Sequence, residues 1–510
     1  MAGPAGPTAP ALSPAQQLAR TLDTLFATPP ADRLVWGVSV RVPGGEPLYQ
    51  RNAGLLLHPA SNMKLVTLAA SAERLGWDFR FQTVIRSTTP VESDGVVRGD
   101  LVVIGGGDPT IGRRHGGQAT LAHLADLVWQ RGVRRIQGRV IGDGSAFGGT
   151  SYGEGWQWDD LPFSYAAPVS ALIYNENTAE FAVSPGPSAG ARAQVTLVDA
   201  AADLDVVNRI TTVASGTARR LSINRTPDDA RVTIRGEIPL GYTPFKQSLA
   251  VADPPAYFAR AFRLALMARG IAVEGPARSS VTDPPGRLID DARGLSIRHQ
   301  SPPLREMATT LMKVSQNLYA EVLFHALGRS VGDQATGADA IALALPSWGA
   351  DAADVVAADG SGLSRYDLTS ATALDALLSR MFTAPAHREP WMAALPIAGV
   401  DGTLERRMKG TPAEGRVRAK TGTIAYVRAL SGYAQTADDG WVQFVVLANN
   451  FAGKVTAADV DRITEQAVNL LVGFSRKAHK MVSLTGAQEV RELSLKKPRL
   501  LTSLSLVEKH

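Results

Sequence analysis

The stretch HPASNMKLVTLAA, residues 58–70, places a serine and a lysine three positions apart at the start of an apolar segment. The apolar run predicts a helix, and residues at i and i+3 of a helix share a face, so Ser61 and Lys64 are expected to point the same way. The first turn of a helix carries a partial positive charge, which favours an oxyanion. The pair therefore predicts a serine nucleophile beside an amine that can accept its proton.

Two further motifs downstream extend this pattern. Ser315-Gln316-Asn317 stands between two helical segments, and Lys420-Thr421-Gly422-Thr423 stands at the start of a predicted hairpin over 427–450. Lys-Thr-Gly occurs once in the chain, whereas Ser222-Ile223-Asn224 and Ser494-Leu495-Lys496-Lys497 repeat the other two patterns elsewhere. Each motif alone also fits a structural role, as a helix N-cap, a helix start or a solvated charge at a strand end. Their order and their contexts together favour catalysis.

Length and charge limit the class of protein. A chain of 510 residues exceeds what one hydrophobic core usually serves, so two or three domains are expected. The formal net charge is +5, and residues 476–510 alone carry eight basic against three acidic residues, which accounts for all of it. The remaining chain is close to neutral, which argues against a nucleic-acid-binding protein.

The sequence leaves two cellular locations open. The chain has no cysteine, so it forms no disulfide or thiolate metal site, and cysteine usage indicates no redox compartment. The stretch MAGPAGPTAPALSP lacks the basic and apolar segments of a secretory signal, and no apolar run reaches the roughly 18 residues that a transmembrane helix needs. We expect either that the protein stays inside the cell or that a signal was removed.

The two ends of the chain share one style, a helix and a hairpin. After residues 1–13, which are rich in Pro, Ala and Gly and expected to be disordered, apolar spacing from Leu18 to Phe26 predicts an amphipathic helix. The stretch LVWGVSVRV at 34–42 opens a predicted hairpin. Towards the other end, the hairpin over 427–450 is followed by a predicted helix from Ala457 to Val472.

The middle of the chain differs in texture. Between about residues 80 and 282, short β-rich runs are separated by Gly, Pro and Asp, with helical periodicity at 256–270, and helices dominate again from about 302 to 384. The simplest organisation is one domain formed by both ends, with an insertion between them. The predicted parts are an extension at 1–13, a discontinuous catalytic domain at 14–79 and 283–475, an insertion of two smaller mixed domains at 80–282, and a basic tail at 476–510.

These features resemble a known family. The set S-x-x-K, S-x-N and K-T-G marks penicillin-recognising serine enzymes. The chain resembles a low-molecular-weight class C penicillin-binding protein of the D-alanyl-D-alanine carboxypeptidase/endopeptidase family, peptidase family S13. The stretches that carry the resemblance are HPASNMKLVT, GDLVVIGGGDPT, GWQWDDLPFSYAAPVSALIYNEN, VSQNLYAEVLFHALG, DGSGLSRYDLTSA and AKTGT. In this family two domains are inserted between the two serine motifs, and 254 residues separate Ser61 from Ser315 here.

The resemblance implies a fold and a set of catalytic roles. The fold is α/β (α+β), a β-lactamase/transpeptidase-like domain with a central antiparallel sheet flanked by helices, plus inserted β-rich mixed domains. Ser61 is expected to attack the carbonyl between two D-alanines and form an acyl-enzyme. Lys64 accepts its proton and must be neutral, so its pKa is expected to be lowered by burial and by nearby Lys420. Ser315 passes the proton to the leaving amine, Asn317 holds the substrate's amide side chain, and Lys420 supplies positive potential.

The resemblance also implies a substrate-binding set. Thr421 and Thr423 are expected to bind the terminal carboxylate, and the backbone N–H groups of Ser61 and Thr423 to form the oxyanion hole. Gly422 is expected to let the substrate lie close to the strand. A carboxylate from the insertion is expected near the catalytic lysines, and Asp160 matches best, with Asp159 as the alternative; either also fits a turn or helix cap.

One residue departs from the family pattern: Gln316 stands where many relatives have Asp or Asn, at a position not expected to touch the scissile bond. The eight histidines form no H-E-x-x-H motif, so neither a metal nor a cofactor is implied.

The leading hypothesis is a serine D,D-peptidase that acts on peptidoglycan stem peptides and is acylated by β-lactam antibiotics. A serine β-lactamase is an alternative, although no clear base for hydrolysing the acyl-enzyme is found. A non-catalytic wall-binding or β-lactam-sensing module is a third reading, against which the intact lysines argue. Because the substrate lies outside the cytoplasmic membrane, we expect export, with the signal absent from this sequence. The basic tail is either a solvated extension or a contact to anionic wall or membrane.

Overall fold

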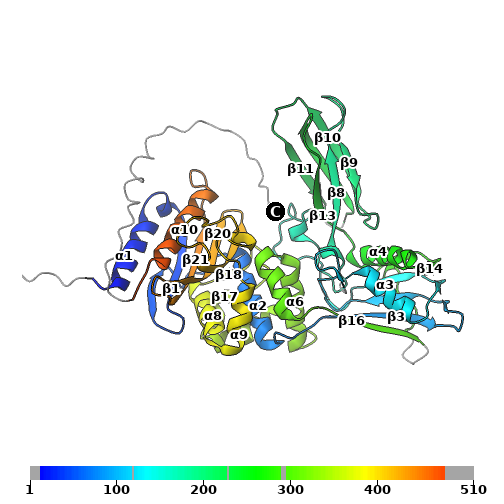
Figure 1. The fold of residues 1–510 in the computed structure, drawn as a ribbon, viewed down its shortest axis with the longest axis horizontal. Coiled ribbons are helices and arrows are strands. Elements are labelled where there is room, and N and C mark those ends of the chain that lie inside the picture. The colour runs from blue at the N-terminus through cyan, green and yellow to red at the C-terminus, as the bar shows by residue number, and fades with distance from the viewer. Residues whose placement is uncertain (1–11, 118–119, 227–228, 289–293, 477–510) are drawn as a thin grey trace, which may run out of the picture.

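The computed structural model describes residues 12–117, 120–226, 229–288 and 294–476. The predicted N-terminal extension up to residue 11 and the basic tail from residue 477 lie outside the described residues. Figure 1 shows an elongated molecule in which the two ends of the chain form one lobe, while the middle of the chain extends away as two further lobes.

A five-stranded antiparallel sheet forms the centre of the first lobe. Its strands are β1 (Val35–Arg41), β2 (Pro47–Arg51), β19 (Val417–Ile424), β20 (Val427–Gln435) and β21 (Trp441–Asn449), in the order β19-β20-β21-β1-β2. Side chains alternate between the faces of a strand, and in β21 Val445 and Leu447 join one hydrophobic cluster while Phe444 and Val446 join another. Both faces of the sheet are therefore buried, and each needs a helical cover.

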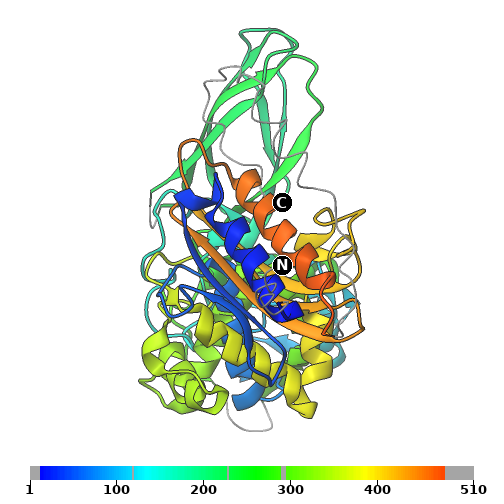
Figure 2. The same cartoon turned by 90° about the vertical axis from the view of Figure 1, so that its left-hand side faces the viewer.

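Helices cover both faces, as the sequence predicts. Figure 2 shows α1 (Pro14–Ala27) and α10 (Ala457–Val472) side by side across one face. Each begins at a capping box, formed by Ser13 with Gln16 in α1 and by Thr456 with Asp459 in α10. The remaining helices of this lobe are α2 (Met63–Arg74), α5 (Leu304–Thr309), α6 (Asn317–Val331), α7 (Gly337–Trp348), α8 (Ala371–Thr383) and α9 (Pro385–Ala394), and the two-stranded sheet of β17 (Val355–Val356) and β18 (Leu368–Thr369) lies among them. The terminal helices and the expected central sheet flanked by helices are confirmed.

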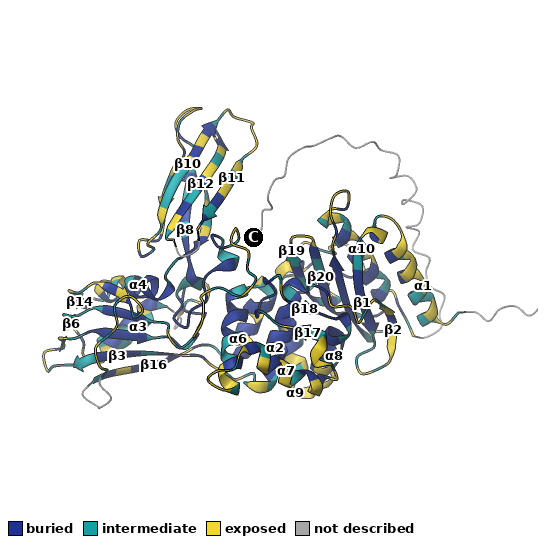
Figure 3. Ribbon diagram, turned by 180° about the vertical axis from the view of Figure 1, so that it is seen from behind, coloured by how far each residue is buried: buried dark blue, intermediate teal, exposed yellow. Residues whose placement is uncertain are grey.

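The middle of the chain, the inserted region, builds the other two lobes. The elements of one are β3 (Gln82–Pro90), β4 (Val96–Val97), β5 (Leu101–Ile104), α3 (Leu121–Gln130), β6 (Arg135–Ile136), β7 (Val140–Asp143), α4 (Pro254–Ala268), β14 (Ala272–Val273), β15 (Ala277–Ser279) and β16 (Gly294–Gln300). Those of the other are β8 (Thr178–Ser184), β9 (Gln194–Leu197), β10 (Asp205–Val213), β11 (Arg220–Arg225), β12 (Arg231–Pro239) and β13 (Phe245–Ala250). Figure 3 shows α6 and α2, which are mostly buried, between the inserted region and the central sheet.

Two features of the inserted region differ from the sequence-based expectation. Strand β16 pairs antiparallel with β3 and completes the sheet β15-β7-β5-β3-β16, so this part of the fold reaches Gln300, beyond the boundary predicted at residue 282. That pairing joins segments that are far apart in sequence, and the local composition of a segment does not indicate its partner strand. Helix α3 was missed, although Leu121, Leu124, Ala125 and Val128 are buried at the helical spacing that predicts it.

Candidate active site

Ser61 and Lys64 lie together at the start of α2, as their spacing predicts. A short 3-10 turn, Ala60–Asn62, precedes the helix and carries Ser61, while Lys64 belongs to the first helical turn. The Nζ atom of Lys64 lies 2.8 Å from Oγ of Ser61. Lys64 has no exposed surface, whereas Ser61 is half-buried. The hydroxyl is thus open to a substrate and in contact with a buried amine.

The other two partners of Lys64 determine how its amine is used. Nζ lies 2.6 Å from Oδ1 of Asn317 and 2.8 Å from the carbonyl oxygen of Ser361. The Asn317 amide donates from Nδ2 to the Tyr165 carbonyl at 2.7 Å, which orients Oδ1 towards Lys64. Oδ1 of Asn317 and the Ser361 carbonyl oxygen can only accept hydrogen bonds, so these two atoms bind the two N–H groups of a neutral Lys64 amine. Its lone pair then faces Ser61, the one partner of the three that has a proton to give.

Burial lowers the pKa of Lys64 to about 7, as expected, whereas the expected contribution of Lys420 to this shift is not found among its causes. The carboxylate of Asp359 acts in the opposite direction and raises the pKa of Lys64, as do Glu321 and Asp367 in their ionised forms. The pKa of Lys420 is lowered well below its usual value, first by burial and then by repulsion from Lys64. Near neutral pH, both the protonated and the neutral form of Lys64 are therefore populated.

Ser315 and Lys420 make a second hydroxyl–amine pair. A π-helical turn, Thr310–Val314, ends at Ser315, which has left-handed backbone geometry with φ of 62°. Lys420 lies fully buried within β19, and its Nζ donates to Oγ of Ser315 at 2.7 Å and to the Thr421 carbonyl at 2.8 Å. A sparsely populated backbone conformation at a polar residue is typical of functional sites, where the surrounding structure maintains it.

Strand β19 packs directly against the turn that carries Ser61. A side chain at Gly422 would place its Cβ 2.7 Å from the Pro59 carbonyl oxygen, so only glycine permits this approach. The missing side chain makes room for Pro59, and the role of Gly422 in letting substrate lie close to the strand stays a prediction. Thr421 and Thr423 alternate with Gly422 along the strand and are half-buried. Oγ1 of Thr421 donates to Oγ1 of Thr403 at 2.7 Å.

The comparison with protein families agrees with this geometry. Residues 18–471 match the model of the D-Ala-D-Ala carboxypeptidase 3 (S13) family. The chain belongs to that family. The D-alanyl-D-alanine carboxypeptidase of Actinomadura sp. (strain R39) is 34% identical over 464 residues, which cover 88% of this chain and 84% of that protein.

Solved structures show the same relationship for this S13 carboxypeptidase. The crystal structure of penicillin-binding protein 4 from Haemophilus influenzae superposes with a TM-score of 0.76 at 25% identity, covering 88% of this chain and 99% of that chain. A second structure of that protein, in complex with a β-lactam, gives a TM-score of 0.69 at 23% identity, with 89% and 99% covered. The predicted fold class and family are confirmed: the chain is a serine D-Ala-D-Ala carboxypeptidase and a penicillin-binding protein.

The 359–364 loop of this S13 carboxypeptidase contributes residues that sequence reasoning missed. The Ser361 carbonyl contacts Lys64, and Gly362 lies so close to the turn Ala60–Asn62 that a Cβ there would come within 1.8 Å of the Ala60 carbonyl oxygen. The stretch DGSGLSRYDLTSA supported the resemblance but received no role, because a backbone carbonyl leaves no signature in a side-chain motif. Its glycine-rich start was the available signal.

Asp160 is linked to Asn317 through Tyr165. Its Oδ1 accepts a hydrogen bond from the Tyr165 hydroxyl at 2.6 Å, and the carbonyl of Tyr165 in turn accepts from Asn317. The alternative residue, Asp159, is exposed. Direct contact of either carboxylate with substrate stays a prediction.

Gln316, the residue that departs from the family pattern, also has a structural role. Its side-chain oxygen accepts from the Leu318 N–H at 3.0 Å, which caps the start of α6. Its Nε2 donates to Glu176 of the inserted region at 2.6 Å. Gln316 therefore ties the second serine motif to the inserted region.

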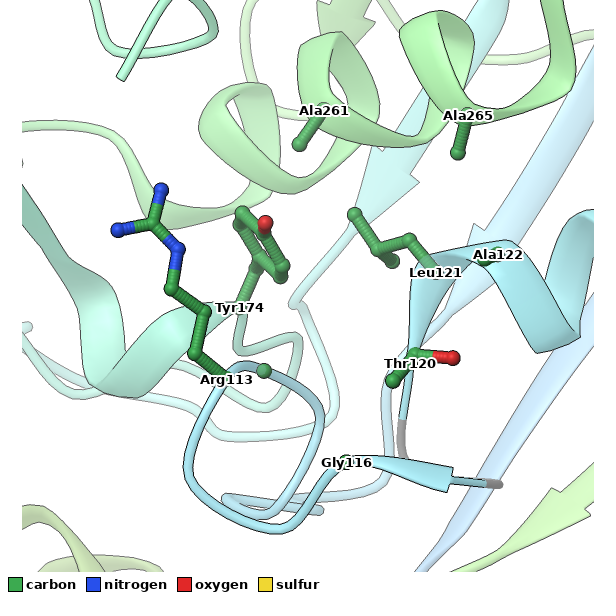
Figure 4. Close-up of a pocket in the computed structure, with 9 residues that line it drawn as sticks. Arg113, Gly116, Thr120, Leu121, Ala122, Tyr174, Ala261 and Ala265 are labelled. Carbon is green, nitrogen blue, oxygen red and sulfur yellow. The ribbon is translucent and has the colours of Figure 1, made fainter. Parts of the chain in front are cut away.

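A separate hollow lies within the inserted region. Figure 4 shows this pocket of about 440 Å³, bordered by Arg113, Leu121, Tyr174 and helix α4. None of the residues that line this pocket belongs to the three motifs, so the pocket is separate from the cluster around Ser61 and Lys64. Within the described ranges, no group of three or more His, Asp or Glu side chains is placed to hold a metal ion. In the same part of the chain, no helix combines the length and apolar character needed to cross a bilayer.

Proposed function

We propose that this carboxypeptidase cleaves the D-Ala-D-Ala bond of peptidoglycan stem peptides through an acyl-enzyme on Ser61, and that it also cuts D-Ala–meso-diaminopimelate cross-links. The observation that carries the proposal is the set of three contacts of Lys64. Asn317 and Ser361 offer acceptors only, which leaves the lone pair of the neutral amine for the Ser61 proton. This arrangement supports Lys64 as the base for acylation.

The remaining roles follow from the neighbouring groups. Ser61 Oγ attacks the carbonyl carbon while its proton moves to Lys64. Ser315, held by the Lys420 amine at 2.7 Å, gives its proton to the leaving amine and takes up in exchange the proton that Lys64 received from Ser61. The backbone N–H groups of Ser61 and Thr423 bind the developing oxyanion, a contribution of about 3 kcal/mol for each donor.

One carboxylate-binding arrangement serves both substrates. In a stem peptide the leaving group is D-alanine, and in the cross-link it is the D-centre of diaminopimelate, so each carries a carboxylate on the carbon next to the scissile nitrogen. Thr421 and Thr423 offer hydroxyl groups for that carboxylate, and Lys420 offers positive potential. Asn317 keeps one N–H of its amide for a substrate carbonyl, since Tyr165 takes the other.

The same chemistry accounts for β-lactams and for location. A β-lactam presents a strained amide with a nearby carboxylate, so it acylates Ser61 as a covalent inhibitor in place of the peptide. Peptidoglycan lies outside the cytoplasmic membrane, and we therefore place the enzyme in the periplasm or cell envelope.

The deciding experiment is product analysis on purified muropeptides, both monomeric pentapeptides and cross-linked dimers, with Ser61→Ala as control. We expect free D-alanine from monomers, monomers from dimers, and neither with the variant. Dimers left intact while monomers lose D-alanine would remove the endopeptidase part of the proposal. Fluorescent penicillin adds a second measurement, because rapid release of hydrolysed drug would indicate a β-lactamase. Labelling without any peptide turnover would indicate a sensing module.

A further inference from the structure

Both acceptors that orient Lys64 are held by one segment of the inserted region, residues 156–165. The carbonyl of Tyr165 accepts from Nδ2 of Asn317 at 2.7 Å and so fixes which end of that amide faces Lys64. At the other end of the segment, Nε1 of Trp156 donates to Oδ2 of Asp359 at 2.8 Å. Trp156 is half-buried, and Asp359 is 1% exposed.

Asp359 holds the loop that carries the second acceptor, Ser361. Its Oδ1 accepts from the backbone N–H groups of Ser361 at 2.9 Å and Gly362 at 2.6 Å, and its Oδ2 accepts from Ser364 N–H at 2.7 Å as well as from Trp156. One buried carboxylate thus closes the loop on itself and ties it to the indole. The Ser361 carbonyl, which contacts Lys64, belongs to this closed loop.

The 359–364 loop packs tightly against the inserted region around the hydrogen bond between Trp156 and Asp359. Ser364 Oγ donates to the Glu154 carbonyl at 2.6 Å, and a Cβ at Gly155 would lie 2.7 Å from that same Oγ. Close packing of this kind leaves the loop little freedom to move separately from residues 153–156. A displacement of the inserted region would therefore reach the Ser361 carbonyl.

We infer that the segment 156–165 positions the catalytic base, since it holds both groups that take the N–H bonds of Lys64 and thereby points the lone pair at Ser61. Trp156 and Asp359 are positioning residues in this arrangement, acting on Lys64 through the Ser361 carbonyl. The inserted region then contributes to the rate of acylation itself, in addition to any contact it makes with substrate. The inference rests on the proposed role of Lys64 as the base.

The test is Trp156→Phe, which removes the N–H donor and keeps an aromatic ring. Acylation by benzylpenicillin is followed by stopped flow to separate the acylation rate constant from the dissociation constant of the preceding complex. We expect the rate constant to fall about tenfold, the effect of losing one hydrogen bond to a charged group, with the dissociation constant unchanged. The matched control is Trp129→Phe, whose ring lies against Arg134 and Arg269 in the inserted region, and which we expect to acylate at the wild-type rate.

A second variant keeps the test decisive. Asp359→Asn places an amide N–H₂ against backbone donors of the 359–364 loop. If Trp156 acts through Asp359, the double variant Trp156→Phe/Asp359→Asn is acylated no more slowly than Asp359→Asn alone. A wild-type acylation rate in Trp156→Phe overturns the inference, as do multiplicative effects in the double variant. Equal loss of binding and acylation together with a lower unfolding temperature also overturns it, because that result describes a structural role only. Failure of the wild-type enzyme to acylate would instead contradict the proposed function.

Discussion

The Nζ atom of Lys64 lies 2.6 Å from Oδ1 of Asn317, a residue 253 positions later in the chain. Asn317 is the first residue of α6, and one turn further along the same face Glu321 accepts from the backbone N–H of Gly360, at 3.2 Å. Helix α6 thus contacts both Lys64 and the loop whose Ser361 carbonyl is the other acceptor of the Lys64 amine. The proton affinity of Lys64 consequently depends on several segments of the chain at once.

The rate of acylation is expected to follow the protonation of Lys64. Only the neutral amine accepts the Ser61 proton, and burial places the pKa of Lys64 at about 7. The acylation rate constant with benzylpenicillin should rise about tenfold per pH unit below that value and level off above it. Unfolding temperatures recorded over the same range serve as the control for stability. A rate that stays constant between about pH 5.5 and 8.5 would exclude Lys64 as the base.

Replacement of Ser315 by alanine is expected to lower kcat/KM on a D-Ala-D-Ala peptide by about a hundredfold or more, the usual range for loss of a proton-transfer group. The reason is the contact of its Oγ with the Lys420 amine. Ser222→Ala is the matched control, since Ser222-Ile223-Asn224 has the same pattern but its serine is exposed on β11 in the inserted region. Similar kinetics in the two variants would contradict the assignment.

Substitution of Gly362 by alanine is expected to abolish acylation, because its Cβ would come within 1.8 Å of the Ala60 carbonyl oxygen and displace the turn that carries Ser61. Gly349→Ala separates this steric effect from backbone strain. Gly349 has a similar φ, 79° against 81°, but no atom within 4 Å of the added Cβ. The Gly349→Ala variant should lose about 1–2 kcal/mol of stability and keep the wild-type acylation rate. Penicillin labelling and thermal unfolding of both variants provide the measurement.

Glu321→Gln is expected to stabilise the protein increasingly as pH rises. Burial and the charge of Asp359 raise the pKa of Glu321 to about 8, so the folded state keeps a proton that the unfolded state loses above about pH 4.5. Stability from this group is therefore present below pH 4.5 and lost as pH rises to about 8, at no more than about 1.4 kcal/mol per pH unit. Glutamine does not titrate. The difference in unfolding temperature between variant and wild type should grow from pH 5 to 8.

The control for this experiment is Glu306→Gln, a change at an exposed position in the first turn of α5. It should show the same small difference in unfolding temperature at both pH values. An equal pH response of the two variants would mean that Glu321 carries no proton in the folded protein near neutral pH.

Local patterns predicted much of the fold. The helix predicted from Ala457 to Val472 has those bounds in the structure, because apolar residues at helical spacing and a capping box specify a helix within a few turns. The hairpin of β20 and β21 was predicted for a similar reason. In contrast, the sequence alone places β16 outside the inserted region, because its partner β3 lies about two hundred residues earlier and the alternation of a strand does not identify its partner.

The sequence alone determined that the Ser61 hydroxyl meets the Lys64 amine, because the two residues are three positions apart and one helical turn brings them together. It also placed the other two motifs in the order that the family requires. Tertiary structure decided everything that depends on distant segments: the contact of Lys64 with Asn317 and Ser361, the repulsion between two buried amines, and the hold of the inserted region on both acceptors. These arise from loop closure and packing across the chain, and no spacing of residues encodes them.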